Sequence, residues 1–170
     1  MKRTRTGVGI VVLALAAATL GATRLMTASA APSSLAKPPE TVLYGHLRSM
    51  TPKAGGRLFE LRFDPAWWLT GFTAKRAKLA DTGSSDVPND YYIVEEGHRL
   101  LTFLVTSSTG VTVLTGGTVG TAITPAELAQ IVAGKNPKHR ALSEPKAGYW
   151  LRVGMKYPNA VTSLDQQYQP

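Results

Sequence analysis

Apolar and polar residues alternate along much of the chain after residue 40, which is the pattern of β-strands with one buried face. Within residues 58–63, Phe59, Leu61 and Phe63 fall on one face and charged side chains fall on the other. A second strand is predicted over 41–50, and a turn that contains proline and two glycines lies between the two strands. We therefore expect these strands to form a hairpin.

Further strands are predicted over 91–95, 99–106 and 111–115, where β-branched and aromatic residues are frequent. A Glu-Gly turn between the first two of these strands predicts a second hairpin. The segments 148–153 and 160–164 flank a turn with the sequence KYPN and predict a closing hairpin. The pattern is therefore mainly β along the whole of this region.

Two short helices interrupt the strands. Thr124 is placed as an N-cap, proline follows it, and Glu127 is the third helical residue, so we expect a helix over 125–133 with a capping box. Another helix is expected over 72–80, with Thr70 as its N-cap.

About seven short strands, joined largely by hairpins and accompanied by two short helices, predict a mainly β fold. The expected architecture is a small antiparallel barrel similar to an OB-fold, with helices plugging its ends. A β-sandwich is the alternative. A parallel α/β fold is not expected, because strands and helices do not alternate along the chain.

Residues 1–30 have the order of a secretory signal peptide. A basic start at Lys2, Arg3 and Arg5 precedes an apolar run of about 13 residues, and small residues end the region at Ala30. A bilayer-spanning helix needs roughly 20 apolar residues, so an uncleaved anchor is the less favoured alternative. We expect the general secretion route, cleavage after Ala30, and a secreted, extracellular protein that meets the membrane only through this peptide.

The mature chain then consists of a leader and one domain. Residues 31–40 are low in apolar side chains and predict a flexible leader. Residues 41–170 predict a single β-rich domain, which is long enough to bury a core without cross-links. The sequence contains no cysteine, so disulfides and thiol chemistry are excluded.

The net charge of the sequence indicates which kinds of binding partner are compatible with it. The formal net charge of the whole sequence is +8, and removal of a signal peptide with four basic residues lowers it to +4. This charge permits weak attraction to anionic wall polymers or lipid headgroups, but no basic run is dense enough to indicate nucleic-acid binding. We expect a monomer that binds no nucleic acid and needs no cofactor.

Four carboxylates are candidates for general acid–base chemistry or for cation binding: Asp64, Asp90, Glu95 and Glu96. Their spacing matches no calcium loop and the three histidines lack metal-ligand spacing, so no metal site is predicted. Asp64 and Asp90 also fit a structural role, in which they cap turns. The Gly-rich segment 116–120 lacks the lysine of a phosphate-binding loop and predicts a flexible loop between a strand and the following helix.

Adjacent aromatic residues occur three times, as Trp67-Trp68, Tyr91-Tyr92 and Tyr149-Trp150. Neighbours in a strand face opposite sides of a sheet, so one member of each strand pair is expected inside and the other exposed or at a rim. Exposed Trp68, Tyr92 and Trp150 would form an amphipathic surface for a sugar ring or a partner protein. The competing interpretation is that these side chains fill the core.

Several of these motifs resemble a known family. FDPAWWLTG at 63–71, VPNDYYIVEE at 87–96, a Tyr-Trp pair and SLDQQYQP at 163–170, in this order, resemble a family of uncharacterised exported proteins of Gram-positive bacteria. The resemblance covers nearly the whole mature chain and implies export and one compact domain. The family has no assigned activity, so the resemblance implies no catalytic residue. The family has acidic residues just after the Thr-Gly of the helix entry, where this chain has Phe72 and Thr73.

These observations favour an exported, non-catalytic domain that binds a cell-envelope component, such as a wall polymer, or an extracellular protein. The alternative is an extracellular hydrolase that uses two of the four candidate carboxylates, which would have to lie roughly 5 to 9 Å apart. A third interpretation is a secreted inhibitor that presents the loop 81–89 to a protease.

Overall fold

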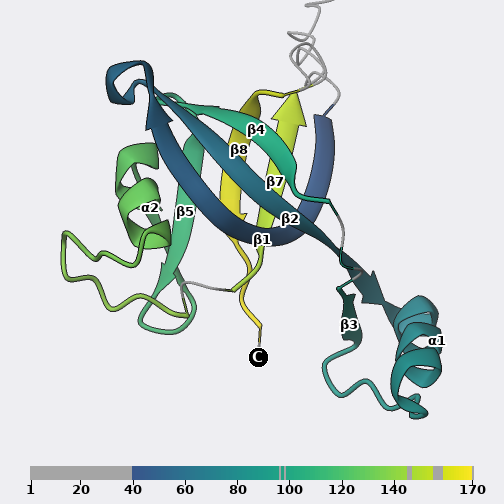
Figure 1. Cartoon of the computed structure of the whole chain (residues 1–170). Coiled ribbons are helices and arrows are strands. Elements are labelled where there is room, and N and C mark those ends of the chain that lie inside the picture. The colour runs from purple at the N-terminus through teal and green to yellow at the C-terminus, as the bar shows by residue number, and fades with distance from the viewer. Residues whose placement is uncertain (1–39, 96, 98, 145–146, 155–158, 170) are drawn as a thin grey trace, which may run out of the picture. The chain divides into compact units, whose positions relative to one another are not determined.

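The computed structural model describes residues 40–95, 97, 99–144, 147–154 and 159–169, which belong to one compact unit, Lys37–Pro170. The predicted signal peptide, and the predicted leader except its last residue, lie outside the described residues. Figure 1 shows the arrangement of the strands and helices. In chain order the elements are β1 (Glu40–Lys53), a 3-10 turn (Ala54–Gly56), β2 (Leu58–Thr70), α1 (Gly71–Thr82), β3 (Tyr91–Val94), β4 (Leu101–Thr106), β5 (Gly110–Thr115), β6 (Val119–Ile123), α2 (Pro125–Val132), β7 (Tyr149–Gly154) and β8 (Val161–Gln166).

The strands form one sheet in the order β3-β2-β1-β7-β8-β5-β6, with β4 paired to β2. The prediction of a mainly β chain with two short helices is confirmed. The OB-like barrel is wrong, because the sheet does not close. The physical reason is that β8 forms a parallel ladder with β5 and not a ladder with β4. Within the described residues, β4 is joined to the segment before β8 by one isolated bridge, between Leu104 and Ala160.

β2 pairs with β1 and is also long enough to pair with β3 and β4 through different parts of the strand. Its first half pairs with β4, with Phe63 opposite Leu101, and its last four residues pair with β3, with Trp67 opposite Val94. The predicted hairpin between the strands over 91–95 and 99–106 is therefore wrong, since each strand pairs with a different part of β2. Figure 1 shows β2 continuing out of the main sheet towards β3 and α1.

Other connections were predicted with mixed success. The first hairpin, β1 with β2, and the closing hairpin, β7 with β8, are confirmed. Most of the predicted closing turn, residues 155–158, lies outside the described residues. The predicted flexible loop over 116–120 is instead a tight turn, with positive φ angles at Gly116 and Gly117, followed by β6. β6 pairs antiparallel with β5, which the sequence pattern did not indicate.

The main core lies between the curved sheet and α2, which contacts β1 and β5 (Figure 1). The alternation predicted for β2 is confirmed, because Phe59, Leu61 and Phe63 are all buried. The other buried members of this core are Met50, Phe103, Val105, Val111, Val113, Leu128, Ala129, Tyr149, Leu151, Val153, Val161 and Leu164.

α2 begins as predicted. The hydroxyl of Thr124 accepts a hydrogen bond from the backbone N–H of Glu127, at 3.2 Å. The Glu127 side chain is 4% exposed, and its carboxylate does not complete a capping box but pairs with Arg140, at 2.5 Å from Nε, and with Lys138, at 2.8 Å from Nζ. The hydrogen bond from Arg140 lowers the pKa of Glu127 although burial opposes the charge.

α1 is present, but its predicted cap is absent. Thr70 occupies the N-cap position without a side-chain hydrogen bond to the helix, and the Thr73 hydroxyl instead donates to the Thr70 carbonyl at 2.7 Å. Of the helices that the structure describes, none is long and apolar enough to cross a membrane.

Candidate functional site

An aromatic cluster lies on the sheet face opposite the main core and consists of Tyr44, Trp68, Tyr91 and Trp150. The ring centroids of Trp68 and Tyr91 are 4.1 Å apart and their planes differ by 12°, so these two rings stack. The Tyr44 ring lies 5.0 Å from each of the two tryptophan rings, in edge-on and tilted arrangements. Contacts of this kind stabilise aromatic pairs beyond the effect of burial alone.

Strand register brings the four rings together. Tyr44 in β1 is opposite Trp150 in β7. On its other side β1 pairs with β2, where Trp68 follows two residues after the partner of Tyr44 and so shares its face. Tyr91 precedes by two residues Ile93, which is the residue of β3 opposite Trp68. Three neighbouring strands and β3 thus each contribute a ring to one face.

The C-terminal tail after β8 satisfies the polar ends of two of these rings. The Trp150 Nε1–H donates to the Gln167 side-chain carbonyl at 2.7 Å, and the Gln169 side-chain amide donates to the Tyr44 hydroxyl at 2.6 Å. The backbone N–H of Gln167 also donates to the carbonyl of Gly148, at 2.8 Å. Tyr44 is 3% exposed, and this burial raises its pKa to about 12.

Close packing beneath Tyr44 requires glycine at position 148. A Cβ atom placed on Gly148 would lie 2.0 Å from the Tyr44 hydroxyl oxygen, which is far inside van der Waals contact. The Tyr44 ring therefore occupies the space that a side chain at 148 would need. This arrangement holds the centre of the aromatic cluster in place.

The structure brings together two of the three predicted ligand-binding aromatics. Trp68 and Trp150 are both half-buried members of the aromatic cluster, with ring centroids 6.0 Å apart. Tyr92 lies on the opposite face of β3, where its hydroxyl donates to Asp81, and this hydrogen bond raises the pKa of Tyr92. Trp67, which is 56% exposed, is the more accessible tryptophan of the Trp67-Trp68 pair.

A pocket of about 480 Å³ opens beside the aromatic cluster, and we refer to it as the aromatic pocket. Its lining residues are Val42, Leu43, Tyr44, Pro65, Ala66, Trp67, Trp68, Arg99, Leu101 and Trp150. Arg99 is the charged residue among them, and the others are apolar or aromatic. Ligand pockets of proteins have this size and this combination of an apolar wall with few polar groups.

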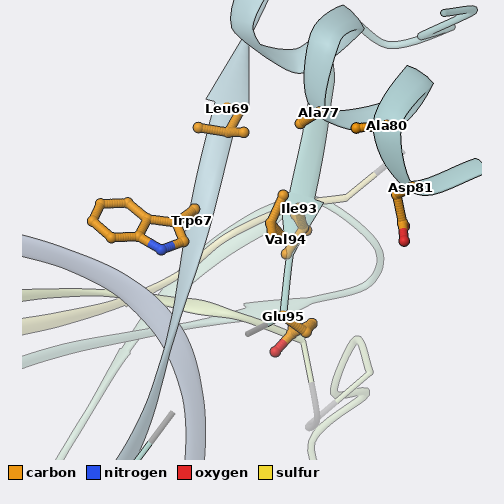
Figure 2. A pocket seen from close by; sticks show the side chains of 8 residues that line it. All are labelled: Trp67, Leu69, Ala77, Ala80, Asp81, Ile93, Val94 and Glu95. Carbon is orange, nitrogen blue, oxygen red and sulfur yellow. The ribbon is translucent and has the colours of Figure 1, made fainter. Parts of the chain in front are cut away.

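A second pocket of about 690 Å³ lies between α1, β3 and the end of β2 (Figure 2). Figure 2 shows Ala77 and Asp81 on the α1 side of this pocket and the Trp67 side chain across β2 from them. Two carboxylates, Asp81 and Glu95, are among its lining residues. Trp67 is a lining residue of both pockets.

Two of the candidate carboxylates pair with side chains of β1. Asp64 accepts a hydrogen bond from Arg48 Nε at 2.8 Å, and Glu95 lies 2.6 Å from His46 Nε2. His46 is also the residue opposite Asp64 in the β1–β2 ladder. Asp90 has a positive φ angle in the turn that precedes β3, whereas Glu96 lies outside the described residues.

Among the residues that the structure describes, no three His, Cys, Asp or Glu side chains gather where they would hold a metal ion. Sequence reasoning did not identify Tyr44, Gln167 or Gln169 as parts of the site. Gln169 and Tyr44 are 125 residues apart in the chain, and Gln167 and Trp150 are 17 residues apart. Local periodicity carries no signal of such pairs.

Known proteins provide no further guide to the site. No protein-family model, curated protein or solved structure matches the chain.

Proposed function

We propose that this chain is an exported, non-catalytic binding domain whose aromatic pocket takes the apolar part of a cell-envelope component. The observation that carries the proposal is the pocket itself, which is lined by exposed Trp67 and Leu101 together with half-buried Trp68 and Trp150. Aromatic and aliphatic walls of this kind favour transfer of an apolar group from water. Arg99 favours a ligand that carries an anionic group beside that apolar part.

The rings that line the pocket are held before a ligand arrives. Stacking of Trp68 on Tyr91 and the hydrogen bond from Trp150 to Gln167 restrict both indoles. A site that is already ordered loses less conformational entropy on binding, and this supports a binding role.

Export is supported by the charged, apolar and small-residue order of residues 1–30 and by the resemblance to exported proteins of Gram-positive bacteria. The stretches that carry this resemblance supply Trp68, Tyr91, Trp150 and Gln167 to the aromatic cluster and its cover. Membership in that family is part of the proposal, because it accounts for why separate motifs occur together.

Binding is tested by titrating the chain that begins at Ala31 with decyl phosphate, as monomers, and following tryptophan fluorescence. We expect saturable binding that weakens roughly tenfold in Trp67→Ala, because the exposed indole contributes apolar contact area. Val119→Ala, which shortens an exposed apolar side chain on β6, is the matched control. The proposal fails if the wild-type protein does not bind, or if both variants bind as tightly as it does.

The envelope as the source of the ligand is tested by cosedimentation with isolated cell walls. Retention at physiological salt that is lost in Trp67→Ala would support it. Retention at low salt alone would reduce the interaction to the net positive charge.

An extracellular hydrolase is the second candidate, favoured by the contact of Glu95 with His46, which is the residue of β1 opposite Asp64 in β2. The ion pair of Asp64 with Arg48 favours a structural role for that carboxylate instead. Turnover of a polysaccharide by the wild-type protein, abolished in Glu95→Gln, would establish the hydrolase in place of the binding domain.

A further inference from the structure

α1 exposes its large apolar side chains, whereas two of its alanines are buried or half-buried. Phe72 is 73% exposed and Leu79 is 52% exposed, whereas Ala74 is buried and Ala77 is half-buried. A surface helix of a globular protein ordinarily does the reverse, because large apolar side chains gain most from burial. Packing within the chain therefore does not account for the exposed Phe72 and Leu79 side chains of α1, which favours a contact with another molecule.

We call Phe72, Lys75, Arg76 and Leu79 the α1 stripe. Phe72 lies three and four residues before the two cations, and Leu79 lies four and three residues after them. Side chains at these spacings lie along one face of a helix. Both cations are exposed, and the Arg76 guanidinium lies 5.9 Å from the centroid of the Phe72 ring. The stripe thus places two positive charges between two apolar side chains.

Negative charge is kept away from this stripe. Asp81 is the acidic residue of α1, and it lies on the opposite side of the helix, where it accepts a hydrogen bond from Tyr92. Lys78 lies outside the stripe and donates to the backbone carbonyl of Asp86 in the following loop. The exposed face of α1 is consequently cationic and apolar at once.

We propose that the α1 stripe docks this domain on an anionic lipid surface. Phe72 and Leu79 enter the boundary between headgroups and acyl chains, and Lys75 and Arg76 pair with lipid phosphates. Charge complementarity favours this occupant. The two cations complement the anionic phosphates of the lipid headgroups, and the apolar side chains beside them complement the acyl chains directly beneath. The surface is distinct from the aromatic pocket, and it departs from the expectation that the membrane is met only through the signal peptide.

The test is flotation of the chain that begins at Ala31 with phosphatidylcholine vesicles, prepared with and without an equal part of phosphatidylglycerol. This chain omits the apolar run of residues 8–20, which would itself bind lipid, and retains the compact unit Lys37–Pro170. We expect binding to the vesicles with phosphatidylglycerol, reduced roughly tenfold or more in Lys75→Glu/Arg76→Glu. Phe72→Ala/Leu79→Ala should also weaken binding, at unchanged net charge.

The matched control is Lys53→Glu/Arg57→Glu, which makes the same change of charge at exposed positions near the β1–β2 turn. Circular dichroism confirms that each variant is folded. The proposal is overturned if the wild-type chain does not bind phosphatidylglycerol vesicles, or if the stripe variants bind as it does. An equal loss in the control variant would also overturn it, because net charge would then account for the binding.

Discussion

The main core and the aromatic cluster are two apolar assemblies on opposite faces of one sheet, and they are built differently. The main core consists largely of aliphatic side chains and phenylalanine, which need no hydrogen-bond partner. The aromatic cluster consists of tyrosine and tryptophan, whose polar ends must be satisfied where they are buried. Gln167 and Gln169 supply those partners, so the aromatic cluster depends on the C-terminal tail as well as on the strands.

The comparison indicates that the two assemblies have different uses. Side chains of the main core, such as Leu61 and Phe63, are fully buried and act through packing alone. Those of the aromatic cluster are half-buried apart from Tyr44, and two of them, Trp68 and Trp150, remain accessible at the aromatic pocket. Stability should therefore depend mainly on the first assembly and ligand binding on the second.

The largest expected effect is in the main core. Phe63→Ala should lower the free energy of unfolding by about 4 kcal/mol, because it leaves a cavity in a fully buried site. Trp68→Ala should lower it by roughly half as much, since that indole is half-buried. Urea denaturation measures both. A greater loss for Trp68→Ala would reverse the comparison and make the aromatic cluster the principal source of stability.

The buried charge beside the main core should have an intermediate effect. Glu127→Gln should cost about 2 kcal/mol at neutral pH, because charge-assisted hydrogen bonds to Arg140 and Lys138 are lost. The folded-state pKa of Glu127 lies below the ordinary value of 4.5, so its contribution is complete above that pH. It is lost as the pH falls through the lower, folded-state pKa.

The difference in unfolding free energy between wild-type protein and Glu127→Gln should therefore shrink in acid. Urea denaturation at neutral pH and at several values below 4.5 measures it. A difference that stays constant with pH would mean that the carboxylate contributes no charge-dependent stability.

The smallest effect should come from the tail. Gln167→Ala and Gln169→Ala should each lower the free energy of unfolding by about 1 kcal/mol. The first leaves the Trp150 indole N–H without its hydrogen-bond partner, and the second does the same to the Tyr44 hydroxyl. Tyr168→Ala, between them and exposed, is the matched control. Thermal unfolding and tryptophan fluorescence report the change. If all three variants behave alike, the tail does not support the aromatic cluster.

Alternation of side chains explains which parts of this fold could be predicted. It placed Phe59, Leu61 and Phe63 in the core and identified the strands of the first and last hairpins, since hairpin partners are close in sequence. The cap of α2 was predictable for the same reason, because Thr124 and Glu127 are three residues apart.

Pairings between distant segments could not be predicted in this way. β3 and β4 looked like a hairpin because a Glu-Gly turn lies between them, yet the length of β2 offered each a separate partner. The parallel pairing of β5 with β8 left the sheet open, and no local pattern distinguishes it from an antiparallel one. In the candidate site, Trp68 and Trp150 were each identified as a member of an adjacent aromatic pair. Their contact with Tyr44 depends on the register of three strands, which local patterns do not give.

Because β3 and β4 pair with different parts of β2, the segment between β2 and β4 can be considered separately from the main core. The chain leaves β2 at Thr70, pairs with the end of β2 through β3, and pairs with its first half from Leu101 onward, opposite Phe63. The intervening segment, which contains α1 and β3, is thus a closed excursion whose two ends are anchored on one strand. Exchange of this segment would remove the β2–β3 ladder and the Tyr91 ring that stacks on Trp68, but it would leave the other ladders of the sheet in place. None of the described residues of the segment belongs to the main core, so such a change would alter the surface and the aromatic cluster while the main core stays the same.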